Sequence, residues 1–539
     1  MGSLGLFLGI RNTKNSTNQM KSKVSIVIVH WNTPDSLKRC LNVLKEHFDD
    51  LQIVVVDNAS SEKPTFIKKD FTGVELIKND INRGFAFACN QGLMRAKAEW
   101  VLFLNPDTEV TYENIIEIIR FSIDHNLDAC SPEFIDSNYK KPLPSWRSFL
   151  VEFSPLHRLI PLNVFKTKTL FGGCLLAKKS SILSLGGWDE RFFLWFEDSD
   201  LTYRLIKEKY NVGWAPVVIK HYGGESFRAL KEPFKKHIFF LSMSIFAKKH
   251  FGFFGNLIIT LIRWRFSRNN ILPHISSGTS IVVPNMKADL LKAFLKKNEQ
   301  FLSDLDEVII VSSGITQEKF WEWKEKYPHF RIIFIEKNNG FASTVNIGFR
   351  VARSKWIGTV NDDVILTSEW VKKLLNCADV DTGSLNPIIH KTNGEIESCG
   401  IEVLDKGKAL PITLSVTSTK KCMQVDATNA ACVLYGHKAL QEIGLFDEKF
   451  ESYLEDIDLS LRIKRKNYKS IVSTEVGVTH IGQSTSISLH SKKQFLDFKN
   501  WILVIIKNWG VKNILIHFPS IFVERLRNIS GILKNLFIF

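Results

Sequence analysis

The sequence lacks the cysteine patterns that mark zinc-binding and disulfide-rich proteins. Its eight cysteines, in 539 residues, include no Cys-x-x-Cys pair and follow no even spacing. This argues against a zinc ribbon and against a disulfide scaffold, and it fits a protein of a reducing compartment. Long apolar runs are missing as well. None reaches the roughly 18 residues that a membrane-spanning helix needs, so we expect no such helix.

No targeting signal is recognisable at the start of the chain. The short apolar patch Leu4–Ile10 is followed, not preceded, by basic residues, and no cleavage site is evident, so we expect no secretory signal. Leu6 stands where the myristoylation pattern requires Ser or Thr.

Acidic residues are scarce in two stretches that carry almost all of the net charge of +15. Between Arg228 and Asn270 there are nine Lys and Arg residues and one acidic residue (+8). From Ser491 to the end there are eight Lys and Arg residues and two acidic residues (+6). Together these two stretches carry 14 of the 15 net charges. A nucleic-acid enzyme would more often spread positive charge and stacking aromatics over its active face, so we expect no nucleic-acid partner.

Apolar residues, by contrast, are plentiful. Hydrophobic residues make up 45% of the chain and aromatic residues 12%, which is enough for two or more globular cores and excludes disorder for most of the length.

The chain also repeats itself. NRGFAFACN recurs as NNGFASTVN and NPD as NDD, both 256 residues on; WFEDSDLTYRL recurs as YLEDIDLSLRI, 258 on, and HYGGES as HIGQST, 259 on. Four motifs in the same order at nearly constant spacing indicate a duplication.

Each half opens with a short β-branched apolar run, a helical stretch and a second such run, ending in VVVDNAS or IIVSSG. This alternation predicts βαβ units and a mostly parallel sheet, with ligands bound beyond the carboxyl ends of the strands. Asp57 and Asp107 both follow apolar runs, so we expect them at that edge. The predicted organisation is an N-terminal tail 1–22, a first domain 23–228, a basic amphipathic segment 229–276, a second domain 277–485 and C-terminal basic amphipathic helices 486–539.

Three acidic positions carry the predicted chemistry of the first half. Asp57 offers an acceptor for the imide N–H of uracil or thymine, although a turn or helix-cap aspartate is the alternative. Asp107 offers a hard oxygen ligand to Mg²⁺ or Mn²⁺, against the alternative of an Asn-Pro-Asp turn. Asp198 opens a predicted helix, where the helix terminus favours the ionised form that a general base needs, although acids there often only complement the helix dipole.

His221 could add an imidazole to the metal or diphosphate site, although a lone histidine is more often structural. Because these residue types recur in order in both halves, the functional interpretation is favoured.

Taken together, the ordered motifs VVVDNAS, NRGFAFACN, NPD, FFLWFEDSDLTYR and HYGGES resemble the family 2 glycosyltransferases, in particular the bacterial rhamnosyltransferase-like group. The resemblance covers roughly 23–270 and 277–510. It implies two tandem GT-A domains (α/β, Rossmann-like, mostly parallel sheet), each followed by basic amphipathic helices. It is specific for the family and says little about the sugar.

The resemblance also implies the roles of the residues. The catalytic bases would be Asp198 and Asp456, and the Mg²⁺ or Mn²⁺ ligands Asp107, His221, Asp363 and His480. The residues that bind a UDP- or dTDP-sugar would be Asp57, Asn82, Gly84, Asn90 and Glu197 in the first half, and Asn338, Gly340, Asn346 and Glu455 in the second. The reaction would be a single displacement with inversion at the anomeric carbon.

One position departs from the pattern. Ser312 stands where the first half has Asp57, and a neutral hydroxyl is a weaker partner for an imide N–H. The second half therefore uses other contacts, binds a different donor, or has lost activity and serves as a scaffold or carbohydrate-binding domain. The other retained acids favour activity.

The two basic stretches mix Lys, Arg, aromatic and aliphatic residues at helical spacing. We expect them to lie in the interface of an anionic membrane; the alternative is ordinary packing against the domains. A membrane surface suits a polyprenyl-linked acceptor, so the sequence predicts a bacterial surface-glycan enzyme, peripheral on the inner face of the cytoplasmic membrane. A nucleotidyltransferase is disfavoured, because HWNTPDS is not the Gly-rich basic loop that such an enzyme needs after its first strand.

Overall fold

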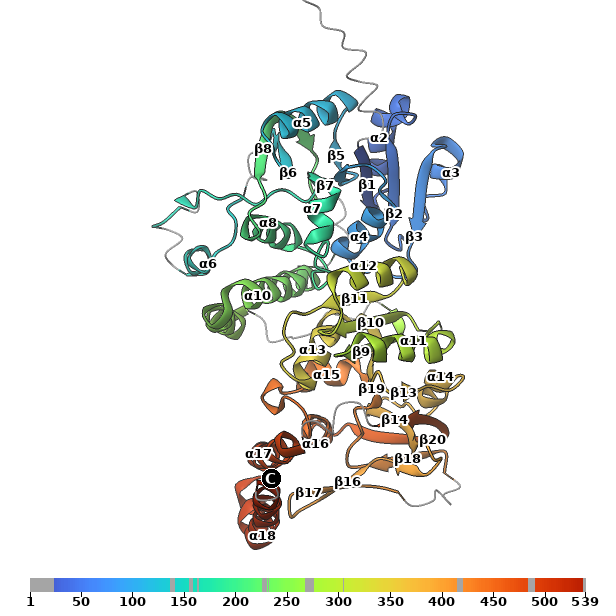
Figure 1. Cartoon of the computed structure of the whole chain (residues 1–539), viewed down its shortest axis with the longest axis vertical. Helices are drawn as coiled ribbons and strands as arrows, with labels where there is room; N and C mark the ends of the chain where they lie inside the picture. The colour runs from blue at the N-terminus through green and yellow to red at the C-terminus, as the bar shows by residue number, and fades with distance from the viewer. Residues whose placement is uncertain are drawn as a thin grey trace, which may run out of the picture. The chain divides into compact units, whose positions relative to one another are not determined.

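The computed structural model describes residues 24–135, 141–154, 159–161, 164–224, 230, 232–266, 276–303, 305–413, 420–482 and 490–536. The predicted tail 1–22 and residues 267–275 of the predicted linker lie outside these ranges. The chain divides into two compact units, Met1–Phe266 and Ser267–Phe539 (Figure 1). The predicted α/β fold in two tandem copies is confirmed.

In the described part of the first unit, the strands form one eight-stranded sheet in the order β3-β2-β1-β4-β7-β6-β8-β5. Four of its seven neighbouring pairs are parallel, so the sheet is mixed, and the expected excess of parallel pairs is small. The strands are β1 (Val24–His30), β2 (Gln52–Asp57), β3 (Val74–Lys78), β4 (Trp100–Leu104), β5 (Thr108–Glu109), β6 (Ala129–Phe134), β7 (Cys174–Lys178) and β8 (Val212–His221).

Helices cover both faces of this sheet, because its central strands are buried on both sides; β2 and β4 are almost wholly apolar and inaccessible to solvent. A capping box at Thr111 begins one of the helices. The described helices of this unit are α2 (Pro34–Leu44), α3 (Phe66–Asp70), α4 (Phe85–Arg95), α5 (Tyr112–Asp124), α6 (Trp146–Glu152), α7 (Lys179–Ser184), α8 (Glu197–Lys207) and α10 (Glu232–Phe266), which is kinked at Gly252, with a 3-10 turn at Lys45–His47.

The described strands of the second unit repeat this sheet position by position, in the order β11-β10-β9-β12-β19-β14-β20-β13. Two strands join it at its side, β15 (Ile396–Ser398) and β18 (Cys422–Val425), and β16 (Ile401–Leu404) and β17 (Lys408–Pro411) form a separate hairpin. The shared strands are β9 (Ser276–Asn285), β10 (Glu307–Ser312), β11 (Arg331–Phe334), β12 (Ser354–Val360), β13 (Val364–Ile365), β14 (Thr382–Lys391), β19 (Cys432–Gly436) and β20 (Lys469–His480).

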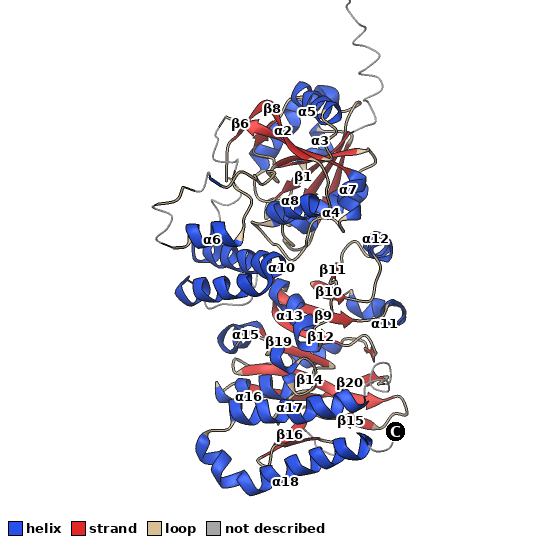
Figure 2. Ribbon diagram, turned by 60° about the vertical axis from the view of Figure 1, so that its left-hand side comes forward, coloured by secondary structure: helices blue, strands red, loops and turns tan. Residues whose placement is uncertain are grey.

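Helices also flank the sheet of the second unit (Figure 2), and α18 has no counterpart among the described helices of the first unit. The described helices of the second unit are α11 (Ala288–Leu302), α12 (Gln317–Lys326), α13 (Phe341–Val351), α14 (Trp370–Leu375), α15 (His437–Ile443), α16 (Glu455–Arg465), α17 (His490–Asn508) and α18 (Val511–Leu536), with a 3-10 turn at Glu448–Phe450.

One disulfide departs from the cysteine analysis. Cys377 and Cys422 are bonded across 45 residues of sequence. Spacing along the chain did not reveal the pair, because the fold, not a local motif, brings the two residues together. Because these two cysteines are bonded, the cysteine spacing no longer supports a reducing compartment.

The basic amphipathic segments fall into two kinds. The first part of α10 and most of α17 pack on their own units: Phe240, Met243 and Phe246 are buried in one, Trp501 and Val504 in the other. In these stretches the apolar side chains pack against the rest of the unit, as the alternative to membrane-interface binding predicted. α18 lies beside α17 (Figure 2) and leaves much of its apolar surface exposed. Across the described ranges, no helix combines the length and apolarity that crossing a membrane requires.

Candidate active site

A cleft of about 810 Å³ opens in the first unit where the parallel strands end. That volume suits a ligand larger than a simple monosaccharide. Six of the predicted site residues line it: Asn82, Gly84, Asp107, Glu197, Asp198 and His221. Residues more than 130 positions apart in sequence therefore meet in one cavity.

Strand pairing brings the two predicted metal ligands together. Asp107 immediately precedes β5, and β5 pairs with the end of β8 so that Thr108 lies opposite His221. His221 Nε2 lies 3.1 Å from Asp107 Oδ1, with both side chains less than one-tenth exposed. The backbone N–H of Tyr222 donates to the Asp107 carbonyl, which holds this register.

This pair fits Mg²⁺ or Mn²⁺ bound through few protein atoms. The described residues contain no group of three or more His, Cys, Asp and Glu able to hold a metal ion. One carboxylate oxygen and one imidazole nitrogen on a cleft wall leave the rest of an octahedral shell to phosphate oxygens and water, which is how such cations are commonly bound beside diphosphates.

The Glu197–Asp198 pair begins α8 behind a strained turn. Trp195 and Phe196 adopt left-handed φ values of 65° and 69°, a conformation that non-glycine residues rarely hold and that concentrates at functional sites. Asp198 accepts hydrogen bonds from the backbone N–H groups of Ser199 (2.6 Å) and Gly172 (3.4 Å). The donors hold the Asp198 carboxylate in place, and both acids line the cleft.

Burial changes the acidity of both carboxyls. It raises the pKa of Glu197 to about 8, with the neighbouring charges of Asp198 and Asp200 adding to the effect. Burial also raises the pKa of Asp198, although its two backbone donors favour the ionised form. The helix terminus is therefore not the only influence on Asp198, because burial opposes the ionised form that the terminus and the two backbone donors favour.

Replacing Glu197 by Gln is expected to remove a pH-dependent contribution to stability. A carboxyl with a pKa of about 8 in the fold, raised from 4.5, keeps its proton where the unfolded chain has released it. Its contribution is therefore full below pH 4.5 and is lost as the pH rises through 8, by at most about 1.4 kcal/mol per pH unit.

Urea unfolding of the wild type and the Glu197→Gln variant, at several pH values from 5 to 8, measures the difference. We expect the wild type to lose stability relative to the variant as pH rises. Parallel pH profiles would contradict a raised pKa at Glu197.

Asn58, the residue after Asp57, organises the NRGF loop. Its side-chain amide donates to Asn82 Oδ1 (2.9 Å) and to the Gly84 carbonyl (3.1 Å), and its Oδ1 accepts from the backbone N–H of Arg83. Gly84 has φ 90°, and a Cβ there would lie 2.8 Å from the Phe193 carbonyl oxygen. A side chain at this position would therefore be strained by the positive φ and would clash with Phe193.

Two predicted donor-binding residues of the first unit do not line the cleft. Asp57 ends β2 beside it, fully buried; its Oδ1 accepts from Ser60 N, and its Oδ2 lies 3.8 Å from Lys63 Nζ. Asn90 is buried in α4, where its amide donates to the Trp188 carbonyl and accepts from Trp188 N. The structure gives Asn90 a packing role, linking α4 to the loop before α8.

The second unit reproduces the metal pair and adds a carboxylate. His480 Nε2 lies 3.3 Å from Asp363 Oδ1, and its Nδ1 lies 3.0 Å from Glu397 Oε2. Burial opposes the charged imidazole, but hydrogen bonds to Asp363 and Glu397 raise the pKa of His480 to about 10. Glu397 comes from the added strand β15 and matches no motif of the repeat, so sequence comparison of the halves could not find it. A carboxylate behind a histidine is the usual way to orient a metal ligand.

The acid pair of the second unit also matches the first. Asp456 accepts from Ile457 N (2.8 Å) and Ala430 N (3.2 Å), and Tyr453 and Leu454 repeat the left-handed turn with φ 72° and 67°. Burial raises the pKa of Glu455 well above its usual range and raises that of Asp456.

The loop before α13 repeats that of the first unit as well. Asn338 Oδ1 accepts from Gly340 N, and Gly340 has φ 98° against the Glu451 carbonyl. Asn346, like Asn90, is bound to backbone, here that of Phe446, and has the same packing role.

Ser312 is built into a different polar arrangement from Asp57. Its hydroxyl donates to Asn285 Oδ1 (2.7 Å), and the Asn285 amide donates to Asp362 Oδ2 (2.6 Å). In the first unit, His30 is the residue of β1 in register with Asp57. Burial lowers the pKa of His30 to about 4, although the negative charge of Asp57 favours the protonated imidazole. In the second unit a carboxylate is thus linked to Ser312 only through Asn285 of β9, and it comes from Asp362, which follows β12.

Comparison with known proteins also finds one family twice in the chain, once in each half. The family model described as "Glycosyl transferase family 2" matches residues 25–184 and 280–421, together more than half of the chain. The low-salt glycan biosynthesis hexosyltransferase Agl10 of Haloferax volcanii is 27% identical over 222 residues, covering 38% of this chain and 69% of that protein. The rhamnosyltransferase WbbL of Escherichia coli K12 is 24% identical over 239 residues, covering 40% and 89%.

Among solved structures, the mannosyltransferase PcManGT of Pyrobaculum calidifontis, in complex with GDP-Man and Mn²⁺, matches with a TM-score of 0.34 and 15% identity. The match covers 55% of this chain and 86% of that one.

Proposed function

The chain belongs to glycosyltransferase family 2, and from that premise we propose that both units are active sites of an inverting, metal-dependent enzyme that extends a lipid-linked surface glycan. One observation carries the proposal. Each unit holds an Asp–His pair, at 3.1 or 3.3 Å, and an aspartate that accepts two backbone N–H bonds beside a buried glutamate. A domain kept only as a scaffold has no physical need for these buried, strained and mutually repelling acids.

In the proposed reaction, Asp198 takes the proton of an acceptor hydroxyl. The oxygen attacks the anomeric carbon from the face opposite the nucleoside diphosphate, so the new C–O bond forms as the bond to the diphosphate breaks, with inversion. Asp107 and His221 would hold a divalent cation, which when bound offsets the charge developing on the leaving diphosphate. Asp456, Asp363 and His480 would act in the same way in the second unit.

We propose a UDP- or dTDP-sugar, such as a deoxyhexose, as the donor of the first unit, since Asp57 offers a buried carboxylate at the end of β2. In the second unit the Ser312–Asn285–Asp362 arrangement favours different base contacts. The competing function, a degenerate second domain that only binds carbohydrate, rests on Ser312 alone.

Purified protein screened against nucleotide sugars, with and without Mn²⁺ or Mg²⁺ and with a lipid-linked acceptor, tests the proposal. We expect metal-dependent transfer, and a donor preference that differs between variants with only one working unit. Absence of transfer and of donor hydrolysis with every nucleotide sugar would overturn it.

We also propose that the exposed face of α18 binds the anionic leaflet that carries the acceptor. Six side chains at intervals of three or four residues are at least 37% exposed on this helix: Val511, Leu515, Phe518, Phe522, Leu526 and Ile529. Lys512 and Arg527 are exposed on the same helix. An apolar stripe flanked by cations is typical of helices that lie in a bilayer interface.

Replacing Leu515 and Phe522 by Glu is expected to weaken binding to anionic vesicles at least about tenfold, because burying one large apolar side chain contributes about 1.5–3 kcal/mol. Vesicle sedimentation measures the effect. The matched control, Asn513→Glu with Ser520→Glu, adds the same charge at exposed polar positions of the helix and should weaken binding much less. Equal losses in both variants, or a loss of self-association instead of vesicle binding, would contradict the lipid assignment.

A further inference from the structure

A lysine from the helix that follows each sheet lies between two aspartates, of which the one on α8 or α16 is wholly buried. In the first unit, Lys249 of α10 places its Nζ 2.6 Å from Asp189 Oδ2 and 2.5 Å from Asp200 Oδ1. Both carboxylates are less than one-tenth exposed, and Asp200 is wholly buried. We call Lys249, Asp189, Asp200 and Arg204 the lysine clamp of this unit.

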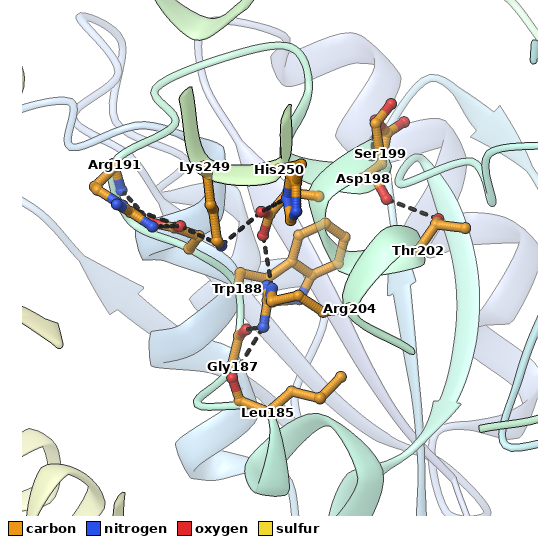
Figure 3. A network of polar contacts seen from close by, with 12 residues as sticks. Leu185, Gly187, Trp188, Arg191, Asp198, Ser199, Thr202, Arg204, Lys249 and His250 are labelled. Carbon is orange, nitrogen blue, oxygen red and sulfur yellow. Dashed lines mark hydrogen bonds and ion pairs between the residues drawn. The ribbon is translucent and has the colours of Figure 1, made fainter. Parts of the chain in front are cut away.

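The lysine clamp joins three segments that border the proposed active site. Asp200 lies on α8, two residues after Asp198, and Asp189 lies in the loop between α7 and α8. Arg204 donates to Asp200 Oδ2 (2.7 Å) and to the carbonyls of Leu185 and Gly187, so α8 and that loop are tied from both sides (Figure 3). Lys249 enters from α10 and closes the arrangement (Figure 3).

The second unit contains the same clamp, each member 258 residues further on. Lys507 of α17 lies 2.7 Å from Asp447 Oδ2 and 2.9 Å from Asp458 Oδ1. Arg462 donates to Asp458 Oδ2 (2.9 Å) and to the carbonyls of Ile443 and Leu445. The next residue of each helix, His250 or Asn508, also contacts the buried aspartate, at 2.8 and 3.0 Å.

The same two helices hold the strained turn before the acid pair. Ser242 of α10 donates to the carbonyl of Leu194 (2.7 Å), which directly precedes the left-handed Trp195 and Phe196. At the matching position of α17, Asn500 donates to the carbonyls of Phe450, Ser452 and Tyr453 (2.9, 2.9 and 2.7 Å). Surrounding contacts of this kind are what a strained backbone requires to persist.

We propose that α10 and α17 fix the geometry of the two active sites, with Lys249 and Lys507 as positioning residues that act through Asp200 and Asp458 on the bases Asp198 and Asp456. The inference rests on the proposed function, since it takes those aspartates as the bases. Without the lysine, the two carboxylates lose the cation that they share. In the first unit they keep only separate partners, Arg191 for Asp189 and Arg204 and His250 for Asp200, so α8 is held less firmly against α10. A displacement of about 1 Å at a catalytic group costs on the order of 10²-fold in rate.

The test compares Lys249→Met, Lys249→Arg and the control Lys248→Met in the full chain. Lys248 is the preceding residue of α10 and is exposed, so its replacement removes the same charge outside the clamp. We expect Lys249→Met to lower kcat of the first-unit reaction about 10- to 100-fold with donor KM within twofold. Lys249→Arg should restore most of the rate, and Lys248→Met should change little. Lys507→Met should act in the same way on the second-unit reaction alone.

Ser242→Ala and Asn500→Ala provide a milder perturbation if the Met variants do not fold. We expect each to lower kcat of its own unit several-fold at unchanged donor KM. Unchanged kcat in folded Lys249→Met or, failing that, in Ser242→Ala and Asn500→Ala overturns the positioning role. Its failure is distinct from failure of the proposed function, because Asp198→Asn would still stop the first-unit reaction.

Discussion

Asp198→Asn is expected to lower the rate of the first-unit transfer about 10²–10⁴-fold, the usual cost of losing a general base. Asn keeps the size of the side chain but has no carboxylate to take the acceptor proton. Because Asp198 is held by the N–H groups of Gly172 and Ser199, the loss should appear in kcat and leave donor binding nearly intact. Steady-state transfer with saturating donor, at fixed metal, measures it.

The matched control lies in the other unit. Asp456→Asn makes the same chemical change in the same local geometry, so it should slow only the second-unit reaction. If either variant retained its own reaction at wild-type rate, that aspartate would not be the base.

Asp107→Ala and Asp363→Ala are expected to reduce transfer by their own units at least about 10²-fold, and EDTA should silence both. The reason is that a bound cation stabilises the departing diphosphate by several kcal/mol, and each 1.4 kcal/mol is tenfold in rate. Activity during titration with Mn²⁺, after EDTA treatment and gel filtration, measures the requirement.

Glu109→Ala is the control for Asp107→Ala. Glu109 is exposed, lies two residues further on in β5 and accepts a hydrogen bond from the Tyr222 hydroxyl. Its replacement should leave the metal requirement unchanged. Full activity in EDTA would exclude the metal role of both Asp–His pairs.

The sequence predicted the fold and the meeting of distant motifs because both follow from periodic patterns. Apolar runs ending in Asp57 and Asp107 identify strand ends, and parallel strands end at one edge. Asp107 meets His221 through one antiparallel pairing, β5 with β8. The recurrence of both motifs in both halves suggests a shared site but does not specify this pairing.

Residues without a repeated motif could not be found in this way. Glu397 arises from an added strand, and Cys377 meets Cys422 only in the fold. Asn90 is a different case: it recurs in both halves and is predicted to bind the donor, whereas its side chain bonds to the backbone of Trp188. A repeated residue marks a shared constraint, and the sequence alone does not say whether that constraint is chemical or structural.

The amphipathic helices were ambiguous for a physical reason. Lys249 looks from the sequence like a cation facing lipid phosphates, whereas the fold buries it between Asp189 and Asp200. Helical spacing describes which residues share a face and not what that face meets.

Product analysis of Asp198→Asn, Asp456→Asn and their mixture tests the central claim, two active sites in one chain, most directly. We predict that the two variants stop at products of different length and that the mixed proteins restore the full product. An unchanged product from Asp456→Asn, with nothing made by Asp198→Asn, would reduce the second unit to a scaffold. A normal product from the double variant would contradict the account in both units.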